Sequence, residues 1–134
     1  MLPYLKKIRE VLKCHMAALP IPFRTTKEQP TFFNLDDNNG CSCPSPHGRT
    51  FPTALDPLYC NRYEIKDFAK VAYELGIKYL GVCCGAAPMH IREVAEAIGR
   101  EVPASRYKEK MSNHFMYGSN KRIPKHISDY GDKA

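Results

Sequence analysis

The feature that most constrains the fold is an apolar segment that leads from a predicted strand into a predicted helix. Residues 77–82 form an apolar run typical of a short buried strand, and 88–98 has the apolar spacing of a helix with proline near its first turn. Cys83 and Cys84 lie between them. In α/β folds, ligands and catalytic groups collect where strands end and helices begin. The sequence therefore predicts an α/β unit with thiols at the position where such folds carry out their chemistry.

The predicted elements alternate between helix and strand, which favours parallel β/α units. Two strands do not make a stable sheet, because each buried strand needs neighbours on both sides. We therefore expect either a piece of a larger α/β fold, which is favoured, or a chain that adds to another chain. The predicted order is a helix over 3–13, a strand leading into a loop within 14–23, a turn-rich loop over 24–57, a helix over 63–75, the strand 77–82 and the helix 88–98.

Each predicted helix has an apolar face that we expect to be buried. Helical side chains three and four positions apart share one face, so this spacing marks the side that packs on the core. Gly76 and Gly99 follow the second and third helices, at the position where glycine often ends a helix. The residues expected on the apolar faces are Leu5, Ile8, Val11 and Leu12; then Ile65, Phe68, Ala69, Ala72 and Tyr73; then Ile91, Val94, Ala95 and Ile98.

Composition indicates an ordinary globular protein of one domain. The chain has 134 residues, of which 43% are hydrophobic and 25% charged. No apolar run approaches the roughly 18 residues that a membrane span requires, and the first residues lack the order of a signal peptide. We therefore expect a cytoplasmic protein. Six cysteines in that compartment should be mostly reduced, which favours metal ligands or buried thiols over disulfides.

The net charge of +6 comes largely from the two ends of the chain. After the last predicted helix, basic residues alternate with aromatic ones, a pattern that nucleic-acid-binding segments share. No recognised nucleic-acid motif accompanies the charge, so a solvated extension or a partner-binding arm is favoured. The basic residues of this tail are Arg100, Arg106, Lys108, Lys110, Lys121, Arg122 and Lys125.

The adjacent cysteines are candidate zinc ligands, because zinc takes thiolates in tetrahedral geometry. Neighbouring side chains on an extended strand point to opposite faces, so Cys83 and Cys84 reach one metal only if the backbone turns there. Gly85 permits such a turn. The dipeptide alone leaves a second interpretation open and favoured, in which one thiol belongs to the core and the other is incidental, because strong zinc signatures use spaced pairs.

The long loop holds a competing candidate site at Cys41, Cys43 and His47. The spacing is too close for a standard zinc knuckle, so exposed loop thiols are the favoured interpretation. His90 lies at the start of the last predicted helix, where a surface or capping role is favoured over metal binding.

The segment 75–92, which contains Gly81-Val82-Cys83-Cys84-Gly85 and then Pro88 and His90-Ile91-Arg92, resembles the last strand and helix of the homocysteine S-methyltransferase family. That family has Gly-Gly-Cys-Cys-Gly, so Val82 replaces a common glycine. The segments 55–57 and 62–65 are similar to the betaine branch of the family, before its penultimate helix. Residues 15–20 resemble its seventh barrel strand, and 113–116 resemble the extension after the barrel.

By this resemblance the fold is a TIM-type (β/α)8 barrel, of which this chain is the C-terminal part, incomplete here. Family members hold zinc through three cysteines, and Cys83 and Cys84 match the adjacent pair. The third follows the sixth strand, at a position that the resemblance places before Met1; Cys14 does not match it. The implied activity is zinc-dependent methyl transfer from betaine to the thiol of homocysteine, which gives methionine and dimethylglycine.

The resemblance implies homocysteine and a methyl donor, with betaine as the donor, as partners. The sequence itself has no long apolar run and no recognised nucleic-acid motif, so we expect no membrane partner and a nucleic-acid partner is disfavoured. The resemblance leaves room for a homo-oligomer of the full-length protein. The implied domains are 1–103, the barrel part, and 104–134, a basic extension. We expect the chain by itself to be inactive, because it lacks the third ligand. The alternative function is a truncated, non-catalytic remnant that binds a partner through its basic tail.

Overall fold

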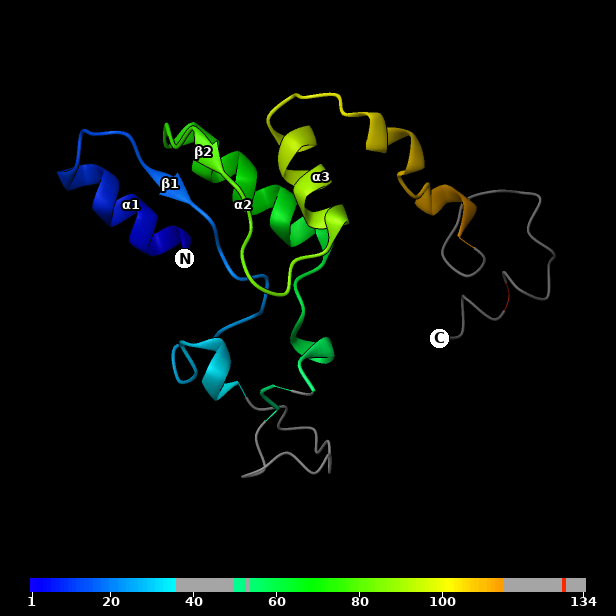
Figure 1. Cartoon of the computed structure of the whole chain (residues 1–134), viewed down its shortest axis with the longest axis horizontal. Helices are drawn as coiled ribbons and strands as arrows, with labels where there is room; N and C mark the ends of the chain where they lie inside the picture. Colours follow the sequence, from blue (N-terminus) through cyan, green and yellow to red (C-terminus); the bar gives the residue numbers. More distant parts are fainter. Residues whose placement is uncertain (36–49, 53, 115–128, 130–134) are drawn as a thin grey trace. The chain divides into compact units, whose positions relative to one another are not determined.

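The computed structural model describes residues 1–35, 50–52, 54–114 and 129 (Figure 1). The chain divides into two compact units, Met1–Val102 and Pro103–Ala134. In the second unit, the described residues include the short 3₁₀ helices η3 (Pro103–Tyr107) and η4 (Met111–Asn113). The candidate loop site and the end of the basic tail lie outside the described residues; these are Cys41, Cys43, His47, Lys121, Arg122 and Lys125.

The helices of the first unit confirm the predicted helical segments. They are α1 (Leu2–Val11), α2 (Arg62–Glu74) and α3 (Pro88–Ala97). Asn61 begins α2, because its side-chain oxygen accepts hydrogen bonds from the backbone N–H groups of Tyr63 and Glu64 at 2.9 and 3.0 Å. Gly76 follows α2 with φ +78°, the left-handed conformation that often ends a helix.

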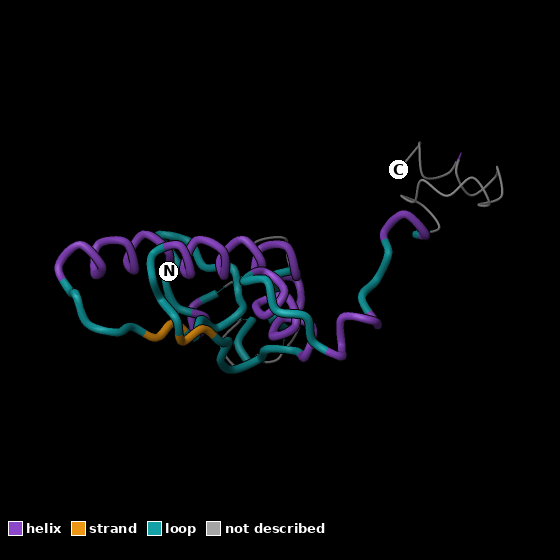
Figure 2. Tube along the Cα trace, turned by 90° about the horizontal axis from the view of Figure 1, so that it is seen from above, coloured by secondary structure: helices purple, strands orange, loops and turns teal. Residues whose placement is uncertain are grey.

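The strands β1 (Ala17–Ala18) and β2 (Tyr79–Leu80) pair in parallel, with Ala17 opposite Tyr79 and Ala18 opposite Leu80. Hydrogen bonds of the same pairing continue past β2, since the Cys83 N–H donates to the Pro20 carbonyl at 2.8 Å. The strand predicted over 77–82 is therefore shorter than expected. The predicted burial of this segment is confirmed at Ile77, which is in the core, and is wrong at Tyr79, which is 66% exposed. The helices α1 and α2 lie on one side of the strand pair (Figure 2). Successive side chains of a strand point to opposite sides, and Tyr79 of β2 is exposed.

The core of the first unit lies between the helices and the inner side of the strands, and α2 and α3 pack against each other. Of the predicted apolar faces, that of α2 is confirmed at Ile65, Phe68, Ala69 and Ala72, whereas Tyr73 is exposed. The core residues are Leu5, Ala18, Ile65, Phe68, Ala69, Ala72, Ile77 and Val94. Among the described residues, no helix combines the length and apolar character needed to cross a membrane.

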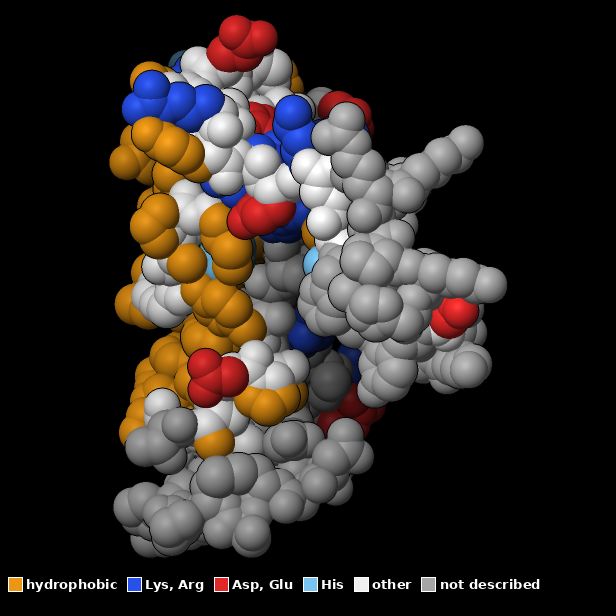
Figure 3. Space-filling model, turned by 90° about the vertical axis from the view of Figure 1, so that its right-hand side faces the viewer, with side chains coloured by type: hydrophobic (Ala, Val, Ile, Leu, Met, Phe, Trp, Pro, Cys, Tyr) orange, Lys and Arg blue, Asp and Glu red, His pale blue; other side chains and the backbone are white. Residues whose placement is uncertain are grey.

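Several apolar positions predicted to be buried are exposed, so apolar spacing alone does not determine which positions of a helix are covered. In α1, Leu5 packs into the core while Val11 is 79% exposed, and Ile91 of α3 is also on the surface. In the view of Figure 3, hydrophobic side chains gather along one side of the molecular surface. The other exposed members of the predicted set are Ile8 and Leu12.

The long connection between β1 and α2 is closed at its base. Phe23 and Tyr59 form an antiparallel bridge. The Cys60 N–H donates to the Pro22 carbonyl, and the Arg24 N–H donates to the Leu58 carbonyl, both at 2.8 Å. This closure brings the start and the end of the connection together, and it places Tyr59 beside the segment that follows β2.

Candidate functional site

Cys83 and Cys84 occupy a tight turn between β2 and α3. The Ala86 N–H donates to the Cys83 carbonyl at 3.1 Å, and Gly85 has φ +82°. A hydrogen bond across four residues, with a positive φ at the third, is the pattern of a type II turn. The predicted role of Gly85 is confirmed, because the left-handed conformation at this position costs a glycine little.

The turn brings the cysteine side chains together. Their Sγ atoms lie 3.5 Å apart, and both residues are exposed and free of disulfide bonds in the described structure. The interpretation in which one thiol is buried in the core is therefore wrong. On a straight strand, the side chains of Cys83 and Cys84 would point to opposite faces. The turn in the backbone instead brings them to the same side.

The pair fits a zinc ion. With Zn–S bonds of about 2.3 Å, tetrahedral geometry places two sulfurs about 3.8 Å apart, close to the observed 3.5 Å between Sγ atoms. Thiolates are also the soft donors that zinc accepts. Among the described residues, no group of three or more His, Cys, Asp or Glu side chains is arranged to hold a metal. Within that part of the chain, Cys83 and Cys84 are therefore a pair of candidate ligands without a third candidate grouped beside them.

Aromatic residues hold the turn from outside. The Tyr59 hydroxyl donates a hydrogen bond to the Gly85 carbonyl. A Cβ added at Gly85 would lie 2.9 Å from two carbons of the Phe23 ring, so this ring packs directly on the glycine backbone. The Phe23 and Tyr59 rings contact each other, with centroids 5.4 Å apart. The bridge at the base of the long connection thus supports the cysteine turn.

His90 is fully buried, at 0% exposure, so its predicted surface role is wrong. The capping role is confirmed, because its Nδ1 accepts a hydrogen bond from the Ala87 N–H at 3.1 Å. Since Nδ1 accepts, the proton of the neutral ring is on Nε2, which donates to the Cys60 carbonyl at 2.9 Å. The ring also packs edge-on against Tyr59, with centroids 4.8 Å apart. His90 therefore joins the start of α3 to the segment before α2.

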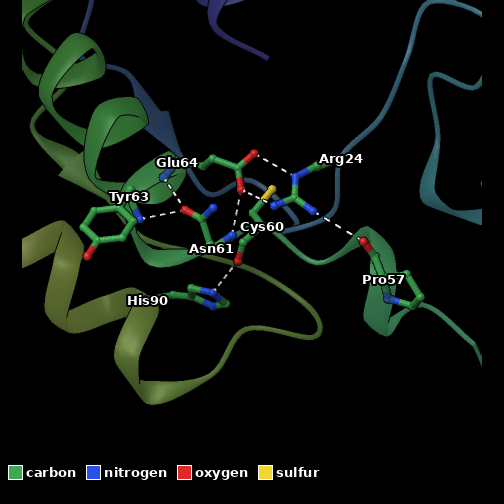
Figure 4. A network of polar contacts seen from close by, with 7 residues as sticks. All are labelled: Arg24, Pro57, Cys60, Asn61, Tyr63, Glu64 and His90. Carbon is green, nitrogen blue, oxygen red and sulfur yellow. Dashed lines mark hydrogen bonds and ion pairs between the residues drawn. The ribbon is translucent and has the colours of Figure 1, made fainter. Parts of the chain in front are cut away.

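An ion pair joins the long connection to the start of α2 (Figure 4). Arg24 donates from Nε and Nη2 to the two carboxylate oxygens of Glu64, at 2.8 and 2.7 Å. The Asn61 N–H donates to the same carboxylate at 2.7 Å. The hydrogen bonds from Arg24 lower the pKa of Glu64 and, reciprocally, raise the pKa of Arg24. Burial, followed by the charge of Glu64, raises the pKa of the nearby Cys60 thiol, which favours its protonated form over a metal-binding thiolate.

The lowered pKa of Glu64 predicts how stability depends on pH. A carboxyl whose pKa falls on folding contributes stability above its unfolded pKa of about 4.3, and loses that contribution as pH falls through the folded pKa. We expect Glu64→Gln to reduce the free energy of unfolding at pH 7 by about 1 kcal/mol or less, because the pair is partly exposed and screened by solvent.

Urea unfolding of the Glu64→Gln variant at about pH 7 and about pH 3 tests this expectation. The variant should lose less stability between these two pH values than the unchanged chain. Glu74→Gln, on the exposed end of the same helix, is the matched control and should retain the pH dependence of the parent chain. If the Glu64 variant retains it as well, the ion pair has no role in acid stability.

A pocket of about 480 Å³ opens beside the turn, with Cys84 and Gly85 in its wall. Such a volume lies within the range of small-molecule sites. Asp56 is a charged residue in this wall. The remaining lining residues are aromatic or apolar, and they are Phe23, Phe32, Pro52, Leu55 and Tyr59.

Sequence reasoning did not identify Phe23 and Tyr59 as parts of the site. Each lies in a segment with no recognisable motif of its own, and the bridge between them joins distant parts of the chain. Gly85 was a signal of such a contact. A glycine at a turn indicates either a positive φ or the close approach of another group. Here both conditions hold.

Comparison with known proteins identifies relatives over parts of the chain, whereas no family model matches. The chain is 42% identical over 69 residues to betaine–homocysteine S-methyltransferase 1 of Danio rerio, which covers 52% of this chain and 17% of the relative. It is 33% identical over 91 residues to the Bos taurus protein of the same name, which covers 67% and 19%. It is 45% identical over 51 residues to the S-methylmethionine–homocysteine S-methyltransferase of Mus musculus, which covers 38% and 14%. The matched part of this chain thus spans less than a fifth of the length of these relatives.

Proposed function

This chain belongs to the homocysteine S-methyltransferase family, and from that premise we propose that Cys83 and Cys84 supply two thiolate ligands to a zinc site for methyl transfer from betaine to homocysteine. The observation that carries the proposal is the convergence of the two exposed thiols to 3.5 Å at the end of a parallel strand. We also propose that the first unit is part of a (β/α)8 barrel, as its alternation of helices and parallel strands supports.

The chemistry required is the loss of the homocysteine thiol proton to solvent and the attack of the resulting sulfur on a methyl group. A free thiol with a pKa of about 8.5 is mostly protonated near neutral pH, although the thiolate is the nucleophile. Zinc bound by the cysteines would lower the pKa of the homocysteine thiol and hold its sulfur in place. The sulfur then forms a bond to a methyl carbon of betaine. The carbon–nitrogen bond breaks, and its electron pair remains on the nitrogen of dimethylglycine.

The residues around the turn hold the sulfur atoms of Cys83 and Cys84 in position for this reaction. Gly85 allows the backbone conformation that directs both thiols to one side, and the Tyr59 hydroxyl holds the Gly85 carbonyl. The adjacent pocket is lined by aromatic residues and Asp56 as well as by Cys84. Aromatic faces and a carboxylate suit a cationic methyl donor, because both attract positive charge.

A graft tests the proposal within a complete enzyme. Residues 15–103 of this chain replace the corresponding segment of the Danio rerio relative, and methionine formation from homocysteine and betaine is measured. We expect the graft to be active. We expect Cys83→Ala or Cys84→Ala in the graft to reduce activity by more than about 100-fold, beyond the 10–100-fold typical of residues that only support a metal ligand.

The matched control is Cys60→Ala, which removes a thiol of the same kind outside the turn. It should leave most of the activity in place, and bound zinc should be lost only with Cys83 or Cys84. An active graft that tolerates Cys83→Ala and Cys84→Ala would overturn the proposal. We expect the chain by itself not to form methionine, because two thiolates hold zinc weakly, and methionine formation by the isolated chain would contradict that expectation.

A further inference from the structure

We propose that the Cys83–Cys84 turn and its adjacent pocket form a binding site for trivalent aryl arsenicals, compounds that join a soft, thiol-seeking atom to an aromatic ring. The site shares its thiols with the proposed zinc centre. It goes beyond the proposed function because it needs only this pair of thiols and the pocket, with no further ligand and no methyl donor.

The first argument is the spacing and exposure of the thiols. At 3.5 Å the two sulfurs are already in contact distance, so a single atom can bind both without movement of the backbone. Both residues are exposed, which gives a reagent access from solvent. Thiolates prefer soft partners. Binding of the first sulfur makes the second bond intramolecular, and such linkage raises affinity by about 100-fold or more.

The second argument is the pocket beside Cys84. Its volume of about 480 Å³ exceeds what a single aromatic ring needs, and Phe23, Phe32 and Leu55 contribute to its lining. A ring attached to an arsenic atom on Cys84 would therefore enter an aromatic and apolar environment. Offset or edge-to-face contact between aromatic rings adds to the benefit of removing the ring from water.

The covalent step is balanced and needs no oxidant. In phenylarsine oxide, arsenic carries one phenyl group and one oxygen. Two arsenic–sulfur bonds form with Cys83 and Cys84, and the arsenic–oxygen bond breaks. The oxygen leaves as water with the two thiol protons, and arsenic remains trivalent.

The test titrates phenylarsine oxide into the full chain, with a chelator present to remove zinc and an excess of a monothiol to compete with single-thiol adducts. The parent carries Cys41→Ser and Cys43→Ser, so that the other closely spaced pair does not contribute. Intact mass should show one arsenical per chain. Cys83→Ala or Cys84→Ala should each weaken binding by about 100-fold, whereas Cys14→Ala, at another exposed thiol, should not change it.

A methyl arsenical of the same oxidation state tests the pocket. We expect the phenyl compound to bind about tenfold more tightly than the methyl compound. Phe32→Ala should reduce that preference while leaving the affinity for the methyl compound unchanged. Unaltered phenylarsine oxide binding in both single-cysteine variants would overturn the dithiol site, and equal affinities for the two arsenicals would overturn the role of the pocket. The titration contains no zinc, so its result tests only the arsenical site. The zinc proposal can fail in the graft experiment while the arsenical still binds.

Discussion

Gly85→Ala is expected to destabilise the first unit by about 3 kcal/mol and to displace the thiol pair. Gly85 has φ +82°, where a residue with a Cβ atom is strained by about 1–2 kcal/mol. The added Cβ would also lie 2.9 Å from the Phe23 ring, so the ring or the turn must move. Urea unfolding measures the loss of stability, and zinc titration measures the effect on the thiols.

Gly99→Ala is the matched control, because it separates backbone strain from the contact. Gly99 has φ +79°, nearly the same as Gly85, and an added Cβ there meets nothing within 4 Å. It should therefore cost about 1–2 kcal/mol. Phe23→Ala combined with Gly85→Ala should recover part of the difference. If Gly85→Ala costs no more than Gly99→Ala, packing of Phe23 does not hold the turn.

His90→Ala is the second large expected effect, a loss of about 2–4 kcal/mol in the free energy of unfolding. The substitution leaves a cavity at a fully buried position and removes the partners of the Ala87 N–H and the Cys60 carbonyl. An unpaired polar group in such a setting costs about 1–3 kcal/mol. Urea unfolding at neutral pH is the measurement.

Two conservative variants test the two hydrogen bonds of His90 separately. In His90→Asn, the side-chain oxygen matches Nδ1 and retains an acceptor for the Ala87 N–H. In His90→Gln, the longer side chain carries a donor to the position of Nε2, toward the Cys60 carbonyl. Each should cost less than His90→Ala. If all three variants are as stable as the parent chain, these hydrogen bonds do not join α3 to the segment before α2.

The sequence allowed the helices and the cysteine turn to be predicted, because both depend on local patterns. The apolar spacing of α2 and the glycine that follows it are signals within a few residues of each other. Likewise, Gly85 permitted a turn that brings Cys83 and Cys84 together, although the dipeptide alone favoured one thiol in the core; the Sγ atoms are 3.5 Å apart.

The support of the turn was not predicted, because it depends on contacts between distant segments. Arg24 and Glu64 are 40 residues apart in sequence, and His90 is 30 residues from Cys60. Local spacing does not determine such pairs. The exposure of Tyr79 has the same origin, since an apolar strand residue is buried only where another layer covers its side of the sheet.

The central claim, that Cys83 and Cys84 are zinc ligands, is tested most directly by X-ray absorption at the zinc edge. The sample is the zinc-loaded graft with Cys41→Ser and Cys43→Ser, compared with the same graft carrying Cys83→Ala and Cys84→Ala as well. We predict a sulfur shell at about 2.3 Å from zinc in the first sample, and its loss in the second. Absence of the sulfur shell from the first sample, or its persistence in the second, would contradict the account.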